Sequence, residues 1–238
     1  MHALHQVLHL FFDPHSFTLA MPDIWAGFQI NLKMMVIAEA LVLVLALLIA
    51  IVRGLPGPAA KPLRALAIGY TDFFRGTPII IVALFIGQGF PGLQLGFVST
   101  QSIVTYGVVT LTLVYTAYVT EVYRAGIESV HASQRAAARS LGLTYMQAMR
   151  YVVIPQAVRR VIPPLLNDFI GLQKDTSLIN ALGVLDVVSR ARFINNSRGT
   201  LTAYSMGAIL FLLVTIPFTR WLDGLIKRQQ AKTLAGRS

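Results

Sequence analysis

The stretch from residue 30 to residue 52 ends in the unbroken apolar run LVLVLALLIAIV, and Lys33 and Glu39 are its only charged side chains. A helix needs about 20 apolar residues to cross the roughly 30 Å hydrocarbon core of a bilayer. The stretch is long enough and apolar enough to do so. It therefore predicts a membrane-spanning helix, which an ordinary soluble domain has no means of covering.

Four further apolar stretches follow along the chain, at residues 63–89, 103–122, 151–172 and 201–221. The first of these is interrupted by FFRGTP, and the third carries Arg159 and Arg160, which we place near its cytoplasmic end. Only 13% of the residues are charged, whereas soluble domains average about 25%. We therefore predict an all-α, polytopic membrane protein with about five transmembrane helices.

The basic residues indicate the orientation of these helices. The chain has 20 Lys+Arg against 10 Asp+Glu, and none of the basic residues lies before residue 31. Most lie between the apolar stretches or after the last one, which is typical of cytoplasmic loops. We expect a multi-pass protein of the bacterial inner membrane, with its N-terminus outside, its C-terminus in the cytoplasm and no nucleic-acid partner. Because no basic n-region precedes the first stretch, we expect no cleaved signal peptide.

Several classes of chemistry are excluded by missing residues. The chain has no cysteine, which excludes disulfides, thiolate zinc sites and a cysteine nucleophile. The nearest approach to a phosphate-binding loop, GLPGPAAK at residues 54–61, lacks the second glycine and the Ser/Thr. HExxH and GxSxG patterns are also missing. We expect no enzymatic activity in this chain, no metal and no cofactor.

The histidines near the N-terminus admit two interpretations. His2, His5 and His9 follow helical spacing, and imidazoles three or four residues apart can share a metal ion. The interpretation that we favour is an amphipathic turn at the membrane interface, with neighbouring leucines touching lipid.

The stretch SQRAAARSLGLTYMQAMRYVVIP, residues 133–155, predicts two short helices. We expect Ser133 to cap the first helix and Gly142 to end it in a left-handed conformation. Thr144 with Gln147 three residues later is a capping box, which opens the second helix. This cytoplasmic helix–glycine–helix lies between the third and fourth spans. It is a shape for docking a partner, or a plain connector on the membrane surface.

The spacing of two alanines, a glycine and an Ile-Pro pair in this stretch resembles the EAA loop of ABC importer permeases. The residues of the resemblance, and hence of the expected ATPase-coupling loop, are Ala136, Ala137, Ala138, Arg139, Gly142, Ile154 and Pro155. Other segments resemble the polar amino acid branch, the histidine/glutamine/arginine-type permeases. These segments are FFRGTP at 73–78, AYVTEVYRAGIESV at 117–130, LGLTYMQAMRYVVIPQA at 141–157 and NDFIGLQKDTSL at 167–178.

The resemblance implies an architecture and a mechanism. It implies an importer transmembrane domain at residues 25–225, after an extracytoplasmic or interfacial segment, 1–24, and before a basic cytoplasmic tail, 226–238. A periplasmic or lipid-anchored binding protein would deliver an amino acid to two permease subunits, identical or paralogous. Two ATPase subunits, which hold ATP and Mg²⁺, would grip the EAA loops and drive alternating access.

The chain departs from the family pattern at one coupling residue. Ala136 stands where the family has Glu, and on our expected cap a Glu there would complete a capping box with Ser133. An ion pair that this Glu makes with the ATPase in relatives would be missing here.

Polar residues inside the spans are candidates for the substrate path, because ionisable groups in a membrane are costly and usually face a cavity or a partner. Asn167 and Asp168 are the best candidates, with a polar clamp between helices as the alternative. Tyr115, Thr116 and Tyr118 are candidates from the third span. For Glu121 and Arg124 we favour a structural ion pair.

Three other functions compete with the amino acid permease. The same architecture could import an opine or another amino acid derivative. A stand-alone secondary transporter would favour inverted repeats, and we see none in the sequence. A membrane enzyme would need convergent catalytic residues.

Overall fold

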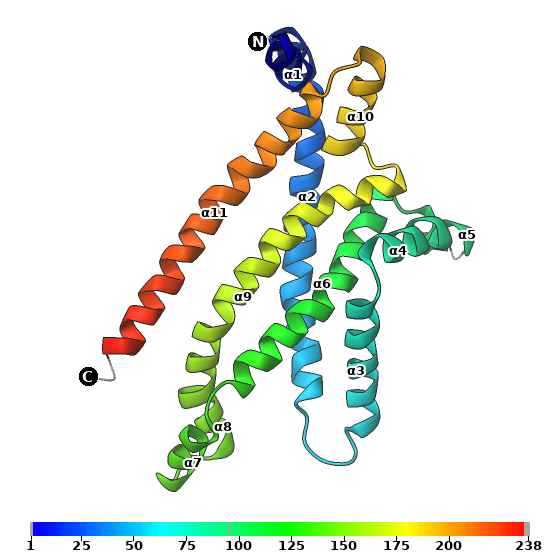
Figure 1. Ribbon diagram of the computed structural model, residues 1–238. Coiled ribbons are helices and arrows are strands. Elements are labelled where there is room, and N and C mark those ends of the chain that lie inside the picture. Colours follow the sequence, from blue (N-terminus) through cyan, green and yellow to red (C-terminus); the bar gives the residue numbers. More distant parts are fainter. Residues whose placement is uncertain (1, 95, 236–238) are drawn as a thin grey trace. The chain divides into compact units, whose positions relative to one another are not determined.

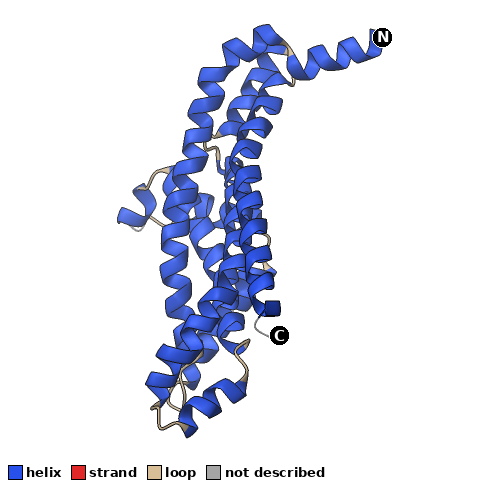
Figure 2. Cartoon of the chain, turned by 90° about the vertical axis from the view of Figure 1, so that its left-hand side faces the viewer, coloured by secondary structure: helices blue, strands red, loops and turns tan. Residues whose placement is uncertain are grey.

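The computed structural model describes residues 2–94 and 96–235, with side chains for residues 5–94 and 96–227. Every element assigned within these residues is a helix (Figure 2), which confirms the all-α prediction. The elements in chain order (Figure 1) are α1 His2–Phe12, α2 Pro14–Arg53, α3 Lys61–Gly76, α4 Ile79–Leu84, η1 Phe85–Gly89, α5 Phe90–Gly92, η2 Gly96–Thr100, α6 Ile103–Glu128, α7 Ala132–Ser140, α8 Tyr145–Ala148, η3 Met149–Val153, α9 Ile154–Asp175, η4 Thr176–Leu182, α10 Val187–Arg198 and α11 Thr202–Ala235.

The helices that are long and apolar enough to cross a membrane number three among the described residues. They are the stretch His5–Arg53, which contains α2, then α6, and the part of α11 from Thr202 to Lys227. The predicted second span is broken between α3 and α4, and it makes a fourth span if that bent pair is counted as one. The predicted span at 151–172 forms the helix α9, but Arg159, Arg160 and Asp168 help to make it too polar to qualify by composition.

Helices α2 and α11 extend past the predicted domain boundaries at 24 and 226. The Asp13 side chain accepts a hydrogen bond from the Ser16 backbone N–H at 2.8 Å, and Pro14 opens α2. An acidic cap followed by proline is a strong helix start, so α2 begins well before the apolar stretch. At the other end α11 continues to Ala235, and residues 236–238 of the predicted tail lie outside the described residues.

The chain divides into two compact units. Unit 1 comprises Met1–Glu39, Pro78–Thr112 and Ile170–Trp221, and unit 2 comprises Ala40–Thr77, Leu113–Phe169 and Leu222–Ser238.

In unit 1, helices α2, α10 and α11 share a buried apolar cluster. Its members include Ile24 and Phe28 of α2, Val187 of α10 and Met206 of α11. A Cβ atom on Gly27 would lie 2.7 Å from the backbone carbonyl carbon of Asp186, closer than any side chain tolerates. A glycine at this position therefore lets α2 approach the start of α10.

In unit 2, helices α6 and α9 approach closely. A Cβ atom on Gly126 would lie 2.0 Å from Cγ2 of Val161, so the two helices meet where α6 has no side chain. Next to this contact Val130, Val153 and Ala157 form a buried cluster. This packing provides a fixed base for the short helices α7 and α8.

Candidate functional site

The loop between α6 and α9 starts with a cap that differs from the predicted one. His131 caps α7, because its Nδ1 accepts a hydrogen bond from the Ser133 backbone N–H at 3.2 Å. The prediction that Ser133 is the cap is therefore wrong, since Ser133 lies inside the first turn. Ala136 consequently lies beyond the third helical position, so a Glu at this position would not complete a capping box, and an alanine there removes no capping bond from α7.

The glycine and the second cap of this loop match their predictions. Gly142 has φ +85°, and its N–H donates to the Arg139 carbonyl at 3.0 Å while the Leu143 N–H donates to the Ala138 carbonyl at 3.2 Å. These two bonds make a Schellman motif, which uses the last carbonyls of α7. Thr144 and Gln147 form both bonds of the predicted capping box, at 2.8 and 3.2 Å.

The loop presents apolar side chains to solvent. Leu141, Tyr145 and Met146 are 84%, 62% and 73% exposed, whereas Ala138 points inward and is 3% exposed. Clustered apolar side chains on a surface typically mark a protein contact. The predicted coupling residues Ala136, Ala137 and Arg139 are exposed beside them, and Ile154 and Pro155 open α9, also exposed.

Unit 2 contains a cavity of about 390 Å³ between side chains of α3, α6 and α9 and the turn after α6. The residues that line it are Arg75, Tyr118, Glu121, Val122, Ala125, Gly126, Ser129, Arg160, Pro164 and Asp168. Two of the predicted path residues, Tyr118 and Asp168, therefore lie at one cavity. The spacing of four between Arg160, Pro164 and Asp168 places them on one face of a helix. From this spacing, Arg160 and Pro164 could have been predicted to line the cavity together with Asp168.

Asp168 has an unsatisfied oxygen in this cavity. Its Oδ2 is buried and makes no hydrogen bond to any residue that the structure describes. Buried carboxylate oxygens are rarely left unpaired, because the lost hydration is not replaced. Asp168, a residue that lines the cavity, therefore keeps one acceptor that no described residue satisfies. Arg75 lines the same cavity, is exposed and has no hydrogen bond or ion pair in the described part of the chain.

Glu121 lines the same cavity but is fully paired. Arg124 donates to its Oε2 from Nε at 3.0 Å and from Nη2 at 2.8 Å, and Arg53 donates to its Oε1. The favoured ion pair with Arg124 is thus present. Sequence reasoning missed Arg53, which directly follows the first predicted span at residues 30–52.

The other three predicted path residues do not line the cavity. Tyr115 and Thr116 are buried, at 6% and 1% exposure, and Asn167 is exposed. Asn167 and Asp168 are neighbours in a helix, so their side chains point about 100° apart. The Asn167 amide and the Asp168 carboxylate therefore do not face the same cavity.

A second polar cluster is buried in unit 1 and was missed by sequence reasoning. Asn31 Nδ2 donates to Thr176 Oγ1 at 3.1 Å and to Asp186 Oδ2 at 3.2 Å, while its Oδ1 accepts from the Val187 N–H at 3.1 Å. Asp186 caps α10 by accepting from the Ser189 N–H at 2.9 Å. Burial raises the pKa of the Asp186 carboxyl, and its hydrogen bonds with Ser189 and Asn31 oppose that rise.

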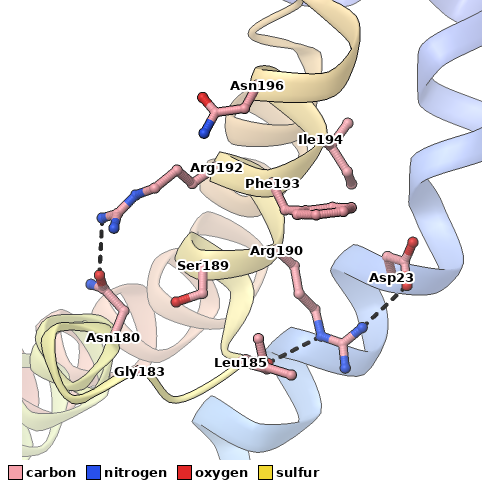
Figure 3. A pocket seen from close by; sticks show the side chains of 10 residues that line it. All are labelled: Asp23, Asn180, Gly183, Leu185, Ser189, Arg190, Arg192, Phe193, Ile194 and Asn196. Carbon is pink, nitrogen blue, oxygen red and sulfur yellow. Dashed lines mark hydrogen bonds and ion pairs between the residues drawn. The ribbon is translucent and has the colours of Figure 1, made fainter.

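A larger cavity of about 570 Å³ in unit 1 lies along α10 (Figure 3). Arg190 donates to Asp23 Oδ1 at 3.1 Å, and Arg192 donates to Asn180 Oδ1 at 3.1 Å (Figure 3). Phe193, which follows them in the sequence, is 76% exposed. The surface combines two guanidinium groups with an apolar ring, a composition typical of protein interfaces.

Known proteins resemble this chain over most of its length. The probable glutamine ABC transporter permease protein GlnM of Bacillus subtilis is 36% identical over 203 residues, which cover 85% of this chain and 91% of GlnM. The glutamine transport system permease protein GlnP of Escherichia coli K12 is 31% identical over 221 residues, 92% of this chain and 98% of GlnP.

Solved structures share the fold. A crystal structure of an amino acid ABC transporter with histidines aligns with a TM-score of 0.82 and 32% identity, covering 91% of this chain and 98% of that one. The MetNI methionine ABC transporter in an inward-facing conformation aligns with a TM-score of 0.67 at 15% identity, covering 91% of this chain and 99% of that one, a likeness of fold alone.

A family model agrees with these relatives. The model for binding-protein-dependent transport system inner membrane components matches residues 57–230, a stretch that contains both the loop with Gly142 and the cavity with Asp168. This chain belongs to the family of inner membrane components of binding-protein-dependent transport systems.

Proposed function

We propose that this chain is the permease subunit of an ABC importer that carries an amino acid, polar or charged, into the cell. Relatives named for glutamine and amino acid transport cover more than four fifths of the chain, and the family is that of a transport component dependent on a binding protein. That dependence favours an importer subunit over a stand-alone secondary transporter.

The observation that carries the substrate class is the unpaired Asp168 oxygen in the unit 2 cavity. A free amino acid presents an ammonium and a carboxylate. Asp168 has an acceptor for the ammonium, and the unpaired Arg75 has donors for the carboxylate. Tyr118 lies beside them and can donate from its hydroxyl. Of the other sequence candidates, the buried Tyr115 and Thr116 support the path from outside this cavity, whereas we assign no substrate contact to the exposed Asn167.

The exposed loop supports docking of an ATPase. Leu141, Tyr145 and Met146 form an apolar surface that Gly142 and the Thr144 capping box hold in shape. ATP and Mg²⁺ bind to that partner, because this chain has no phosphate-binding loop. We propose that two ATPase subunits bind two permease subunits. Ala136 has no charge and contributes no ion pair to that contact.

The binding protein docks on the other side of the membrane. The basic residues after the first and last predicted spans favour a cytoplasmic side for both, and alternation of the five predicted spans then assigns residues 123–150 to the cytoplasm and residues 173–200 to the outside. The N-terminus would lie outside and the C-terminus inside. Arg190, Arg192 and Phe193 on α10 (Figure 3) suit a partner surface that carries carboxylates.

An uptake assay tests the substrate class. The chain is produced with the ATPase and the binding protein of its own transport system, and ATP-dependent uptake of labelled glutamine, arginine and histidine is measured in membrane vesicles. We expect one of these or a close relative to be taken up and to compete with the others. Uptake that only an opine inhibits would support the amino acid derivative instead, and uptake without ATP would contradict an ABC importer.

A glycine substitution tests the docking surface. Gly142→Val forces a β-branched residue into a left-handed conformation, at a local cost of roughly 1–3 kcal/mol. We expect normal amounts of the variant in membranes and loss of ATPase co-purification.

Gly57→Val is the matched control for this substitution. Gly57 has φ +88°, and at both Gly57 and Gly142 an added Cβ atom would meet no other atom within 4 Å. This control carries the same strain in a different loop, so we expect it to keep the ATPase. Equal behaviour of the two variants would contradict the docking role.

A further inference from the structure

Helix α1 has an apolar side and a polar side. Val7, Leu8 and Phe11 are 37–52% exposed and fall on one face of the helix, while His5, Gln6 and His9 share the opposite face. The side chain of His2 lies outside those that the structure describes. Figure 1 shows α1 end-on beside α2, which runs along the page, and Figure 2 shows α1 extending sideways from α2. An amphipathic helix turned across a spanning helix is typical of the membrane interface.

The C-terminal end of α1 is bonded to the turn between α10 and α11. The Leu10 carbonyl accepts from the Leu201 N–H at 2.9 Å and from Thr200 Oγ1 at 3.0 Å. The Asp13 N–H donates to Thr202 Oγ1 at 3.1 Å. Three bonds across so large a sequence separation fix α1 in place, so its polar side chains have defined neighbours.

A cavity of about 390 Å³ lies between α1 and this turn. The residues that line it are His5, Gln6, His9, Leu10, Asp13, Ser16, Arg198, Gly199 and Thr200. Arg198 is exposed and makes no hydrogen bond or ion pair with the rest of the described chain. Its five N–H donors are therefore available to a ligand in or beside the cavity.

The one acid among the residues that line this cavity is already used by the protein. Asp13 Oδ2 accepts from the Ser16 N–H at 2.8 Å at the positive end of α2, and Oδ1 lies 3.5 Å from His9 Nε2. The remaining polar groups include Arg198 and His5, a permanent cation and a ring that can donate. The cavity thus holds one cation that the described protein leaves unpaired, and it lies beside an apolar helix face.

We propose that this cavity binds the phosphate of an anionic phospholipid, with Arg198 as the main donor and His5 as a second. A phosphate oxygen suits a guanidinium, which binds it through two parallel N–H groups. Free phosphate shares this chemistry. The exposed face of Val7, Leu8 and Phe11 on the same helix favours a ligand that also carries acyl chains.

The test is lipid retention by the full chain, purified in mild detergent and examined by native mass spectrometry. Equal amounts of phosphatidylglycerol and phosphatidylcholine are added, and bound lipid is counted for the unmodified chain and for Arg198→Gln. We expect phosphatidylglycerol to be preferred, and the preference to fall about tenfold in the variant, because Arg198 would supply the charged hydrogen bonds to the phosphate.

The matched control is Arg192→Gln, an exposed arginine on the same helix that lines a different cavity. It removes the same charge, so we expect unchanged lipid retention. Equal losses in the two variants, or none in Arg198→Gln, would overturn the site. Equal binding of the two lipids would overturn its preference for an anion. Displacement of phosphatidylglycerol by millimolar inorganic phosphate would assign the site to a free anion instead of a lipid. Thermal unfolding of each variant confirms that it is folded.

Discussion

Unit 1 and unit 2 each hold an aspartate away from water, and the two are treated in opposite ways. Asp186 in unit 1 is fully buried, and its oxygens accept hydrogen bonds from Ser189 and Asn31. Asp168 in unit 2 has a buried oxygen with no partner within the described chain. A carboxylate whose partners are all internal fixes the fold, because moving it leaves several groups unsatisfied. A carboxylate without an internal hydrogen-bond partner is available to a ligand or to another protein.

Glu121 shows that unit 2 does not lack partners for acids. It lines the same cavity as Asp168, yet two arginines from α2 and α6 pair with it. The difference within one cavity is therefore specific to Asp168. The proposed substrate site rests on this difference between the two aspartates. Substitutions in unit 1 and in unit 2 can test it.

The largest effect is expected from Asn31→Leu in unit 1. It would leave Asp186 Oδ2 and the Val187 N–H buried without partners, and each such group costs about 1–3 kcal/mol. We expect a clear fall in the midpoint of thermal unfolding and a low yield of monodisperse protein by size exclusion. Asn196→Leu, an exposed amide on α10, is the control. Equal stability of the two variants would show that the cluster does not hold unit 1 together.

A smaller effect, on transport instead of folding, is expected from Asp168→Asn. A hydrogen bond to a charged group contributes about 1.5–3 kcal/mol, so uptake should fall about tenfold or more. Because Asp168 has no partner at Oδ2 within the described chain, the thermal midpoint and the yield of intact complex should not fall. Asn167→Ala changes the exposed neighbour outside the cavity and should transport normally. Unchanged uptake, or a complex that dissociates, would remove Asp168 from the site.

The smallest effect is expected from Glu128→Gln. Glu128 pairs with Arg124 near the end of α6, with side chains 62% and 37% exposed. Exposed pairs contribute at most about 1 kcal/mol, and Arg124 keeps its bonds to Glu121. We expect thermal unfolding and uptake close to those of the unmodified chain. A large loss of either would mean that the arginines around Glu121 depend on this outer acid.

Local rules predicted much of this structure from the sequence. Apolar length located α2, α6 and α11. The glycine and capping-box rules located the Gly142 and Thr144 features, because each of these depends on neighbours within a few residues. The His131 cap was missed because serine is a much commoner cap than histidine. The extension of α2 to Pro14 was missed because it depends on a cap outside the apolar stretch.

Long-range pairing could not be predicted in this way. Asn31 and Asp186 are 155 positions apart, and Arg53 and Glu121 are 68 apart. The choice among Asn167, Asp168 and Tyr115 depends on the rotation of each helix about its axis. A span with polar residues on several sides does not reveal that rotation in its sequence.

The helical run from Tyr145 through η3 to Asp168 contains no loop. At 1.5 Å per residue it reaches roughly 35 Å, from the proposed docking surface to Asp168. The run departs from regular α-helix at two places, the π-helical turn at Met149–Val153 and the pair Pro163–Pro164, where proline removes helical hydrogen bonds. A displacement at one end of this run is transmitted to the other end, because no flexible loop interrupts the helix. A movement of the helix at Met146 would therefore shift the position of Asp168.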